Sequence, residues 1–301
     1  MLGYYVLILI SVIMFGGGFA LQDAYRKMRG SSLKISMEST CIGALAGLVV
    51  LLIIDGFAFE LTPFTAVMAI LTAINAMALT FCTFKGLDYI NLSLFSVFAM
   101  LGGMVLPFFQ GIIFYGEGFS LAKGVCLLFI CISLAFTIER GEKKKGTIFY
   151  VGIFVLNGLS GVFSKIYAES ELPKASSAGY SVWMALATVI LSGAIWFVLS
   201  QLDRKKAISE GDVPEKTDNK TLTLSYGAGA AFGVVNKVAN FFLLVALLRV
   251  DTSVLSPLVT GGTMIVSTAI SYFEGKKPTR NQVISVALSF VGMIALFAIP
   301  I

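Results

Sequence analysis

Ten apolar segments follow one another along the chain, and the connections between nearly all of them are short. They cover residues 3–21, 35–54, 63–84, 92–114, 121–137, 148–167, 178–200, 223–247, 252–273 and 280–300. A helix needs about 20 mostly apolar residues to cross a bilayer. We therefore predict an all-α polytopic membrane protein with ten transmembrane helices, in which only the connection 201–221 is long and hydrophilic.

Composition agrees with this prediction and excludes several kinds of site. The 301 residues are 57% apolar and 13% charged, whereas soluble domains carry about 25% charged residues. The sequence has no histidine, which removes histidine metal sites, Ser-His and Cys-His nucleophile pairs and histidine proton relays. Its four cysteines lie inside apolar segments without metal-ligand spacing, so we expect no metal and no cofactor.

Two halves of the chain resemble each other in the same order. LSLFSVFAMLGGM (92–104) matches TSVLSPLVTGGTM (252–264), with one residue deleted before the glycine pair, and YYVLILISV (4–12) matches FYVGIFVLN (149–157). GFALQ (18–22) likewise matches GVFSK (161–165). Five helices per copy is an odd number, so the second copy must enter the membrane from the opposite side. The sequence thus predicts two inverted five-helix repeats, 1–145 and 146–301, in one membrane domain.

The basic residues are concentrated in alternate connections. The odd-numbered connections carry Arg26, Lys27, Arg29, Lys34, Lys85, Arg140, Lys143, Lys144, Lys145, Arg204, Lys205, Lys206, Lys216, Lys220, Lys276, Lys277 and Arg280. The even-numbered connections and their margins carry only Lys123, Lys174 and Arg249. Because Lys and Arg mark the cytoplasmic side, we expect the odd connections in the cytoplasm and both termini outside.

Each half also contains a helix that ends in an aromatic residue and a Glu-Gly pair, followed by a hydroxyl residue that opens the next segment. The two copies are FYGEGFSLAKGVCLL (114–128) and YFEGKKPTRNQVISVALSFVGMIAL (272–296). With the Ser- and Gly-containing helices before them, they resemble the drug/metabolite transporter superfamily, specifically its ten-helix EamA-type carriers. The resemblance implies a secondary carrier of small metabolites that works by alternating access through a central cavity. Such carriers are often described with cytoplasmic termini, in contrast to the charge pattern here.

The strongest candidate for a binding residue is Lys237, near the middle of the eighth segment. A lysine at a bilayer centre costs about 2.5–3.5 kcal/mol on insertion scales, so it usually faces a cavity or a partner. At about 100° per residue, Asn236 and Asn240 share its side of the helix. These three groups suit a substrate carboxylate or phosphate, and the alternative is a structural lysine paired with carbonyls or a carboxylate.

Further polar residues lie in the third and sixth segments. Asn75 occupies almost the same place in the first half as Asn236 in the second, so the two amides are candidates for opposite walls of a cavity. The alternative for Asn75 is an interhelical hydrogen bond. Asn157 and Ser160 have helical spacing and are candidate cavity residues. Lys165 ends the sixth segment, where snorkelling to the membrane surface is the expectation.

We predict a secondary active transporter in the cytoplasmic membrane. Its expected partners are a small polar substrate, anionic or zwitterionic, the lipid bilayer, and a proton as the candidate coupling ion. No basic patch with interleaved aromatic residues indicates nucleic acid. The alternative is an exporter of lipophilic drugs or amines in which Lys237 is structural. An intramembrane enzyme is remote, because the GLSG sequence at 158–161 has no histidine base to serve it.

Overall fold

The computed structural model describes residues 2–89, 92–137, 147–210, 218–273 and 280–298. These residues form the helices α1 (Leu2–Arg29), α2 (Leu33–Asp55), α3 (Pro63–Gly86), α4 (Leu92–Tyr115), α5 (Leu121–Thr137), α6 (Thr147–Glu169), α7 (Ser177–Glu210), α8 (Asn219–Ala246), α9 (Thr252–Phe273) and α10 (Arg280–Ala298). The all-helical fold class is confirmed, and the described residues contain no strand.

Six of these helices are long and apolar enough to cross a membrane. They are α1, α2, α3, α6, α7 and α8, by their length and composition. Their outward surfaces carry large apolar side chains such as Ile53, Ile74 and Phe197, all of them exposed. Exposed apolar stripes of this size would be a liability in water, so the fold is that expected of an integral membrane protein.

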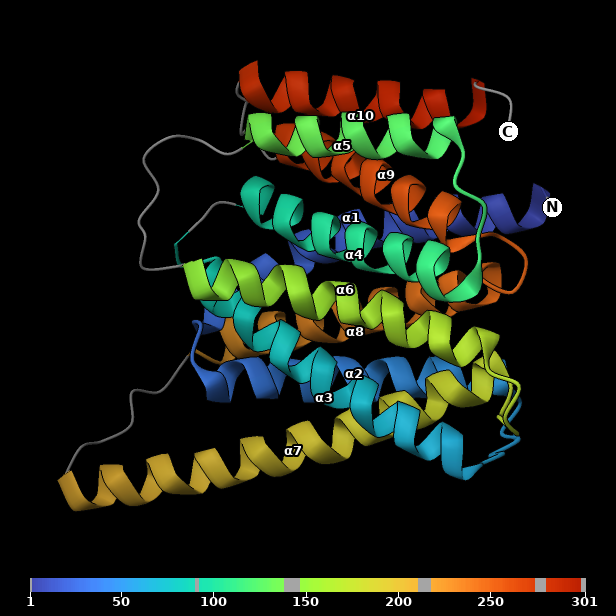
Figure 1. The fold of residues 1–301 in the computed structure, drawn as a ribbon. Helices are drawn as coiled ribbons and strands as arrows, with labels where there is room; N and C mark the ends of the chain where they lie inside the picture. Colours follow the sequence, from blue (N-terminus) through green and yellow to red (C-terminus); the bar gives the residue numbers. More distant parts are fainter. Residues whose placement is uncertain (1, 90–91, 138–146, 211–217, 274–279, 299–301) are drawn as a thin grey trace.

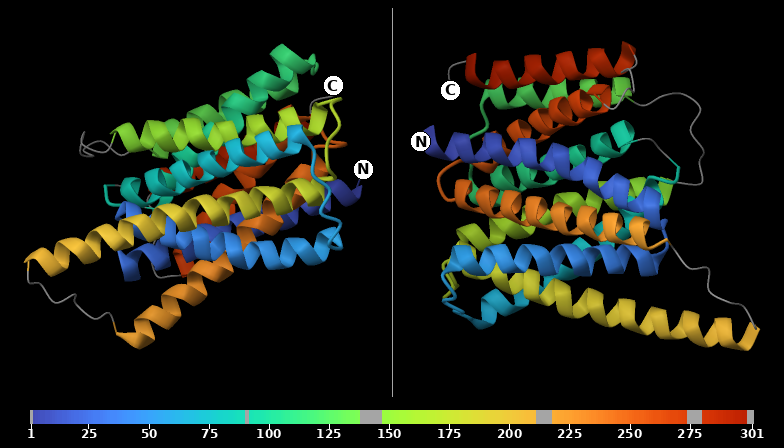
Figure 2. Two further views of the ribbon diagram at one scale, coloured as in Figure 1. Left: turned by 90° about the horizontal axis from the view of Figure 1, so that it is seen from below. Right: turned by 180° about the vertical axis from the view of Figure 1, so that it is seen from behind.

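The helices run roughly along a common direction, and most neighbours in space are distant in sequence (Figure 1). Helix α1 packs against α8 and α9, while α2 packs against α7 and α8. Helix α4 lies between α6 and α9, α3 contacts α6 and α7, and α5 pairs with α10. The beginning of α1 and the end of α10 lie at the same end of the bundle, which both views in Figure 2 also show.

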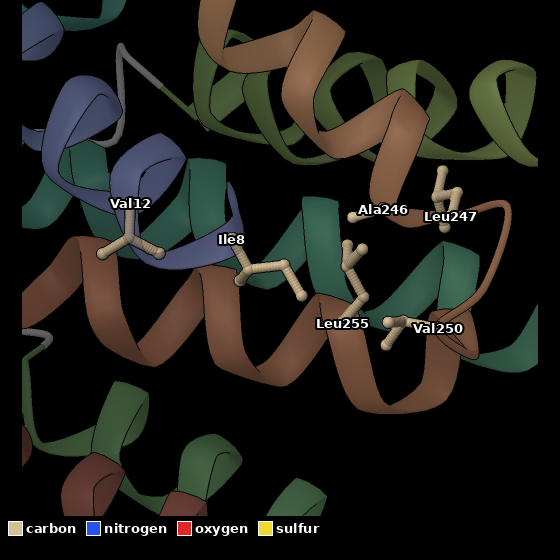
Figure 3. Packing of buried hydrophobic residues seen from close by; sticks show 6 residues of the cluster. All are labelled: Ile8, Val12, Ala246, Leu247, Val250 and Leu255. Carbon is tan, nitrogen blue, oxygen red and sulfur yellow. The ribbon is translucent and has the colours of Figure 1, made fainter. Parts of the chain in front are cut away.

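Apolar side chains close the bundle at the end where α8 is joined to α9. One buried cluster contains Ile8 and Val12 of α1, Ala246 and Leu247 at the end of α8, Val250 in the α8–α9 connection and Leu255 of α9 (Figure 3). At the same end, the Lys174 ammonium donates to the carbonyl oxygens of Tyr167, Ala168 and Ser170, which lie at the end of α6. A cation at this position satisfies carbonyls that have no partner within the helix. Partial burial lowers the pKa of Lys174, and the nearby Glu169 carboxylate opposes that shift.

The expectation of a solvated loop over residues 201–221 is wrong for most of that stretch. Helix α7 continues through Glu210, and α8 begins at Asn219. The end of α7 extends past the other helices (Figures 1 and 2). The segment QLDRKKAISE is polar but rich in good helix formers, so leaving the membrane changes the exposure of this helix without ending it.

The hydroxyl residues of the two Glu-Gly turns, Ser120 and Thr279, are the expected N-terminal caps of the helices that follow. The Ser120 hydroxyl accepts a hydrogen bond from the Lys123 backbone N–H at 3.3 Å, which confirms it as the cap of α5. The corresponding Thr279 lies outside the described residues.

Candidate functional site

A cavity of about 240 Å³ lies inside the bundle. Residues of α1, α2, α3, α4, α6, α7, α8 and α9 line it. Helices α5 and α10 contribute none of the described lining residues and pack against each other beside α9. The cavity is therefore built from both halves of the chain.

Helix α8 brings three of the predicted residues to this cavity. Asn236, Lys237 and Asn240 all line it. The Asn240 amide donates to the Asn236 carbonyl oxygen at 2.8 Å and to the Asn236 side-chain oxygen at 3.1 Å. The two amides are thus fixed along one turn of their own helix, beside the lysine.

Lys237 is buried, with 9% of its surface exposed. Its aliphatic stem packs on Gly47 of α2, where an added Cβ would lie 2.6 Å from Lys237 Cγ. One turn away, a Cβ at Gly233 would overlap the backbone of Gly43, so α2 and α8 are in direct backbone contact. Among the described residues, no hydrogen bond or ion pair engages the Lys237 ammonium. The close packing that these glycines allow fixes the aliphatic stem of Lys237, and the residue lines the cavity.

Helix α6 contributes further polar residues to the cavity lining. Asn157 and Ser160 line the cavity, as expected from their spacing. The Asn157 side-chain nitrogen donates to the Ala99 carbonyl of α4, and an added Cβ at Gly103 would lie 2.7 Å from that nitrogen. Asn157 thereby ties α6 to α4 and leaves its side-chain oxygen as an acceptor.

Asn75 does not lie where the symmetric argument placed it. It is absent from the cavity lining among the described residues, and its nitrogen donates to the Leu156 carbonyl and to Ser160 Oγ, both at 2.8 Å. Asn75 therefore joins α3 to α6 and donates a hydrogen bond to the cavity residue Ser160 without lining the cavity itself. The interhelical alternative describes its contacts, and the expectation of two facing amides is not met.

Lys165 is also buried rather than snorkelling, with 3% of its surface exposed. Its ammonium lies 2.8 Å from Glu117 in the turn between α4 and α5, and 2.9 Å from Glu169 one turn along α6. Glu117 additionally accepts a hydrogen bond from the Thr252 N–H at the start of α9, at 3.1 Å. The carboxylate of the first Glu-Gly turn thus connects α6 and α9, a role that spacing alone could not indicate.

Tyr180 and Trp183 open the seventh apolar segment, where the sequence favours interfacial anchors over a substrate cage, but Tyr180 lines the cavity. It is buried, its ring stacks on Tyr167 with 3.8 Å between centroids, and its hydroxyl lies 2.8 Å from Thr72 Oγ1. Trp183, beside it, donates to the Glu60 carbonyl and remains partly exposed. An aromatic residue near a segment end suits both positions, so the sequence carried no signal to separate them.

No protein-family model matches the chain, and no curated protein matches it. A solved structure, described only as the crystal structure of a protein, is similar over 97% of this chain and 96% of that chain. Its TM-score is 0.71 and its sequence identity is 14%. At this identity the likeness shows a shared fold alone.

Proposed function

We propose that this protein is a secondary active transporter of a small polar, anionic metabolite. It would act by alternating access in the cytoplasmic membrane, as an EamA-type member of the drug/metabolite transporter superfamily. Lys237 is the counter-ion for the substrate, Asn236, Asn240, Asn157 and Ser160 are its neighbours, and Asn75 supports Ser160.

The helix contacts support two inverted repeats, 1–145 and 146–301. Exchanging α1–α5 with α6–α10 turns the α1–α8 contact into α6–α3, the α4–α6 contact into α9–α1, and the α2–α8 contact into α7–α3. All of these pairs pack against each other. The pairs α2–α7, α4–α9 and α5–α10, which exchange with themselves, also pack. A repeated contact pattern of this kind is what alternating access requires, because each half can take up the conformation of the other.

Close contacts support the same alignment at the level of residues. Matching 4–12 with 149–157 and the two glycine pairs makes Val12 the counterpart of Asn157 and Gly262 the counterpart of Gly103. An added Cβ at Gly103 would meet Asn157, and one at Gly262 would lie 2.8 Å from Val12. The two copies thus cross at equivalent points, with an amide in one and an apolar side chain in the other.

The unpartnered ammonium of Lys237 carries the functional proposal. A buried charge is expensive unless something pairs with it. The described residues offer it no carboxylate, so a substrate anion is the partner that makes its position favourable. Sites for drug-sized ligands usually measure about 300–1,000 Å³; at about 240 Å³ this cavity suits a small metabolite better.

Orientation follows from the basic residues. The described odd connections and helix ends carry Arg26, Arg29 and Lys85, which favours the cytoplasm for that end of the bundle. Accessibility of a C-terminal tag tests this, and a cytoplasmic tag would overturn it.

Uptake by proteoliposomes containing the purified protein tests the function. A panel of amino acids, hydroxy acids, sugar phosphates, nucleosides and amines is first screened by thermal stabilisation, and the stabilising compounds are then tested for transport. Lys237→Gln is expected to abolish saturable uptake, while Lys237→Arg, which keeps the charge, retains part of it. Uptake with unchanged apparent affinity in Lys237→Gln would remove Lys237 as counter-ion.

The lining also contains Phe15, Phe19, Phe95 and Phe232, which favours lipophilic compounds as the second candidate. A resistance screen in an expressing host separates the two. Resistance to lipophilic amines that survives Lys237→Gln would support that exporter instead.

A further inference from the structure

The chemistry of the cavity lining restricts the substrate further than its size does. This argument rests on the proposed function and concerns the same cavity. Among the described residues that line it, Lys237 is the one basic side chain, and none is an aspartate or a glutamate.

The charge of a bound substrate therefore decides the charge of the whole site. A monoanion makes a neutral pair with Lys237. A zwitterion leaves one positive charge in excess, a dianion leaves one negative charge, and a cation adds to the lysine. In a site removed from water, an uncompensated charge carries a desolvation cost that a neutral pair avoids.

Several of the hydroxyl side chains that line the cavity share a second property. Six of them donate their hydrogen to the backbone carbonyl four residues earlier: Thr40, Thr80, Ser160, Ser164, Ser181 and Thr188. A hydroxyl has one hydrogen but two lone pairs. Once the hydrogen is committed to the backbone, the group can only accept a further hydrogen bond from the cavity.

The amides add acceptors in the same way. Asn157 donates one amide hydrogen to the Ala99 carbonyl, and Asn240 donates to both the backbone and the side-chain oxygen of Asn236. Asn157 and Asn240 each keep a side-chain oxygen that can accept a hydrogen bond. These hydroxyls and amides therefore surround a single cation with several acceptors, and they favour a ligand that brings its own donors.

We infer that the substrate is a hydroxylated monocarboxylate. Its carboxylate pairs with Lys237, and its hydroxyl groups donate to the back-bonded hydroxyls and amide oxygens of the surrounding helices. Hydroxyl groups satisfy these acceptors without adding charge, which an ammonium group cannot do.

Isothermal titration calorimetry of the full chain in lipid nanodiscs tests the inference with four three-carbon probes. Glycerate carries both features, propionate lacks the hydroxyls, serine has an ammonium in place of one hydroxyl, and glycerol lacks the carboxylate. Gluconate and hexanoate repeat the first comparison at greater length. We expect at least one of the two hydroxy acids, glycerate or gluconate, to bind more tightly than its matched probes. Lys237→Gln is expected to weaken the affinity for that hydroxy acid at least about tenfold.

A hydroxyl variant tests the second half of the argument. Thr80→Val keeps the shape of the side chain and removes its accepting oxygen. It is expected to weaken binding of the hydroxylated acid about fivefold and to leave the affinity of its deoxygenated partner unchanged. Thr223→Val is the matched control, since Thr223 makes the same bond to Asn219 but is exposed on α8 outside the cavity.

Three results would overturn the inference. Serine binding as tightly as glycerate would make the substrate a zwitterion, and equal binding of propionate would remove the role of the hydroxyls. Failure of both hydroxy acids to bind would overturn it as well. In each case, Lys237-dependent transport of another compound from the wider panel would leave the proposed function standing, and its absence would remove both.

Discussion

Lys165 and Lys237 are both buried in helices long and apolar enough to cross a membrane, and their surroundings differ completely. Lys165 has two carboxylates within 2.9 Å, and one of them, Glu117, also binds the first turn of α9. Lys237 has no partner among the described residues and lines the cavity. The first lysine is part of the scaffold, whereas the second is available to a ligand. The position of a lysine in an apolar segment therefore identifies a costly charge. The side chains around that lysine decide whether it is structural or available to a ligand.

Replacing Lys165 should have the largest effect on stability. Lys165→Met takes the ammonium away from the buried Glu117 carboxylate, and removing one partner of a buried ion pair costs about 3–5 kcal/mol. Equilibrium unfolding in mixed micelles measures the loss, with Lys205→Met on the exposed end of α7 as the control. Adding Glu117→Gln should recover part of the loss. A Lys165→Met protein as stable as the control would contradict the structural role.

Replacing Lys237 should change stability in the opposite direction. Lys237→Met removes a buried charge that has no described partner and keeps most of the packing on Gly47. By insertion scales, the gain is up to about 3 kcal/mol, and ligand-induced stabilisation disappears at the same time. The same unfolding assay measures both, with Lys237→Arg as the variant that keeps the charge. A loss comparable to that of Lys165→Met would mean that Lys237 is a second scaffold lysine.

Asn75 and Asn240 allow the same comparison between a structural residue and a cavity residue, with smaller expected effects. Asn75→Ala breaks two hydrogen bonds between α3 and α6, and such bonds average about 0.6 kcal/mol in a membrane protein. Asn240→Ala removes a group beside Lys237 whose hydrogen bonds, within the described part of the chain, run along its own helix. We expect the first variant to change stability more than ligand affinity, and the second to do the reverse. Ligand titration and equilibrium unfolding of both variants measure these changes. Equal changes in ligand affinity and in stability for the two variants would contradict the different roles of Asn75 and Asn240.

Sequence reasoning was most successful where membrane physics leaves few choices. Segments 121–137 and 252–273 coincide with α5 and α9, because both segments are strongly apolar and clearly polar residues precede them. It was less successful at the ends of α1 and α7. There the helix continues into water beyond the apolar segment, so apolar length does not mark its end. The glycines that follow Arg29 and Glu210, Gly30 and Gly211, are the better signal for where it stops.

The residue types of the cavity lining were predictable from the sequence, but the hydrogen-bond partners of those residues were not. Asn236, Lys237 and Asn240 were placed together correctly because all three belong to one helix, whose geometry fixes their mutual spacing. Asn75 and Tyr180 were misplaced because several helices surround each of them. Which face of α3 meets α6, and how deeply the start of α7 lies, depends on packing that the local sequence does not contain.

The sequence by itself determined the helical class, the order of the helices, the glycine pairs and the presence of a costly lysine in the eighth segment. These follow from local rules: the period of the helix, the length of a span and the cost of charge in hydrocarbon. Only the tertiary structure decided that Glu117 reaches Lys165, that glycines of α2 and α8 leave Lys237 facing a cavity, and that Asn75 supports the wall from behind. Those outcomes depend on contacts between residues far apart in the chain, because several helices can approach each buried polar group and only their packing selects which one does.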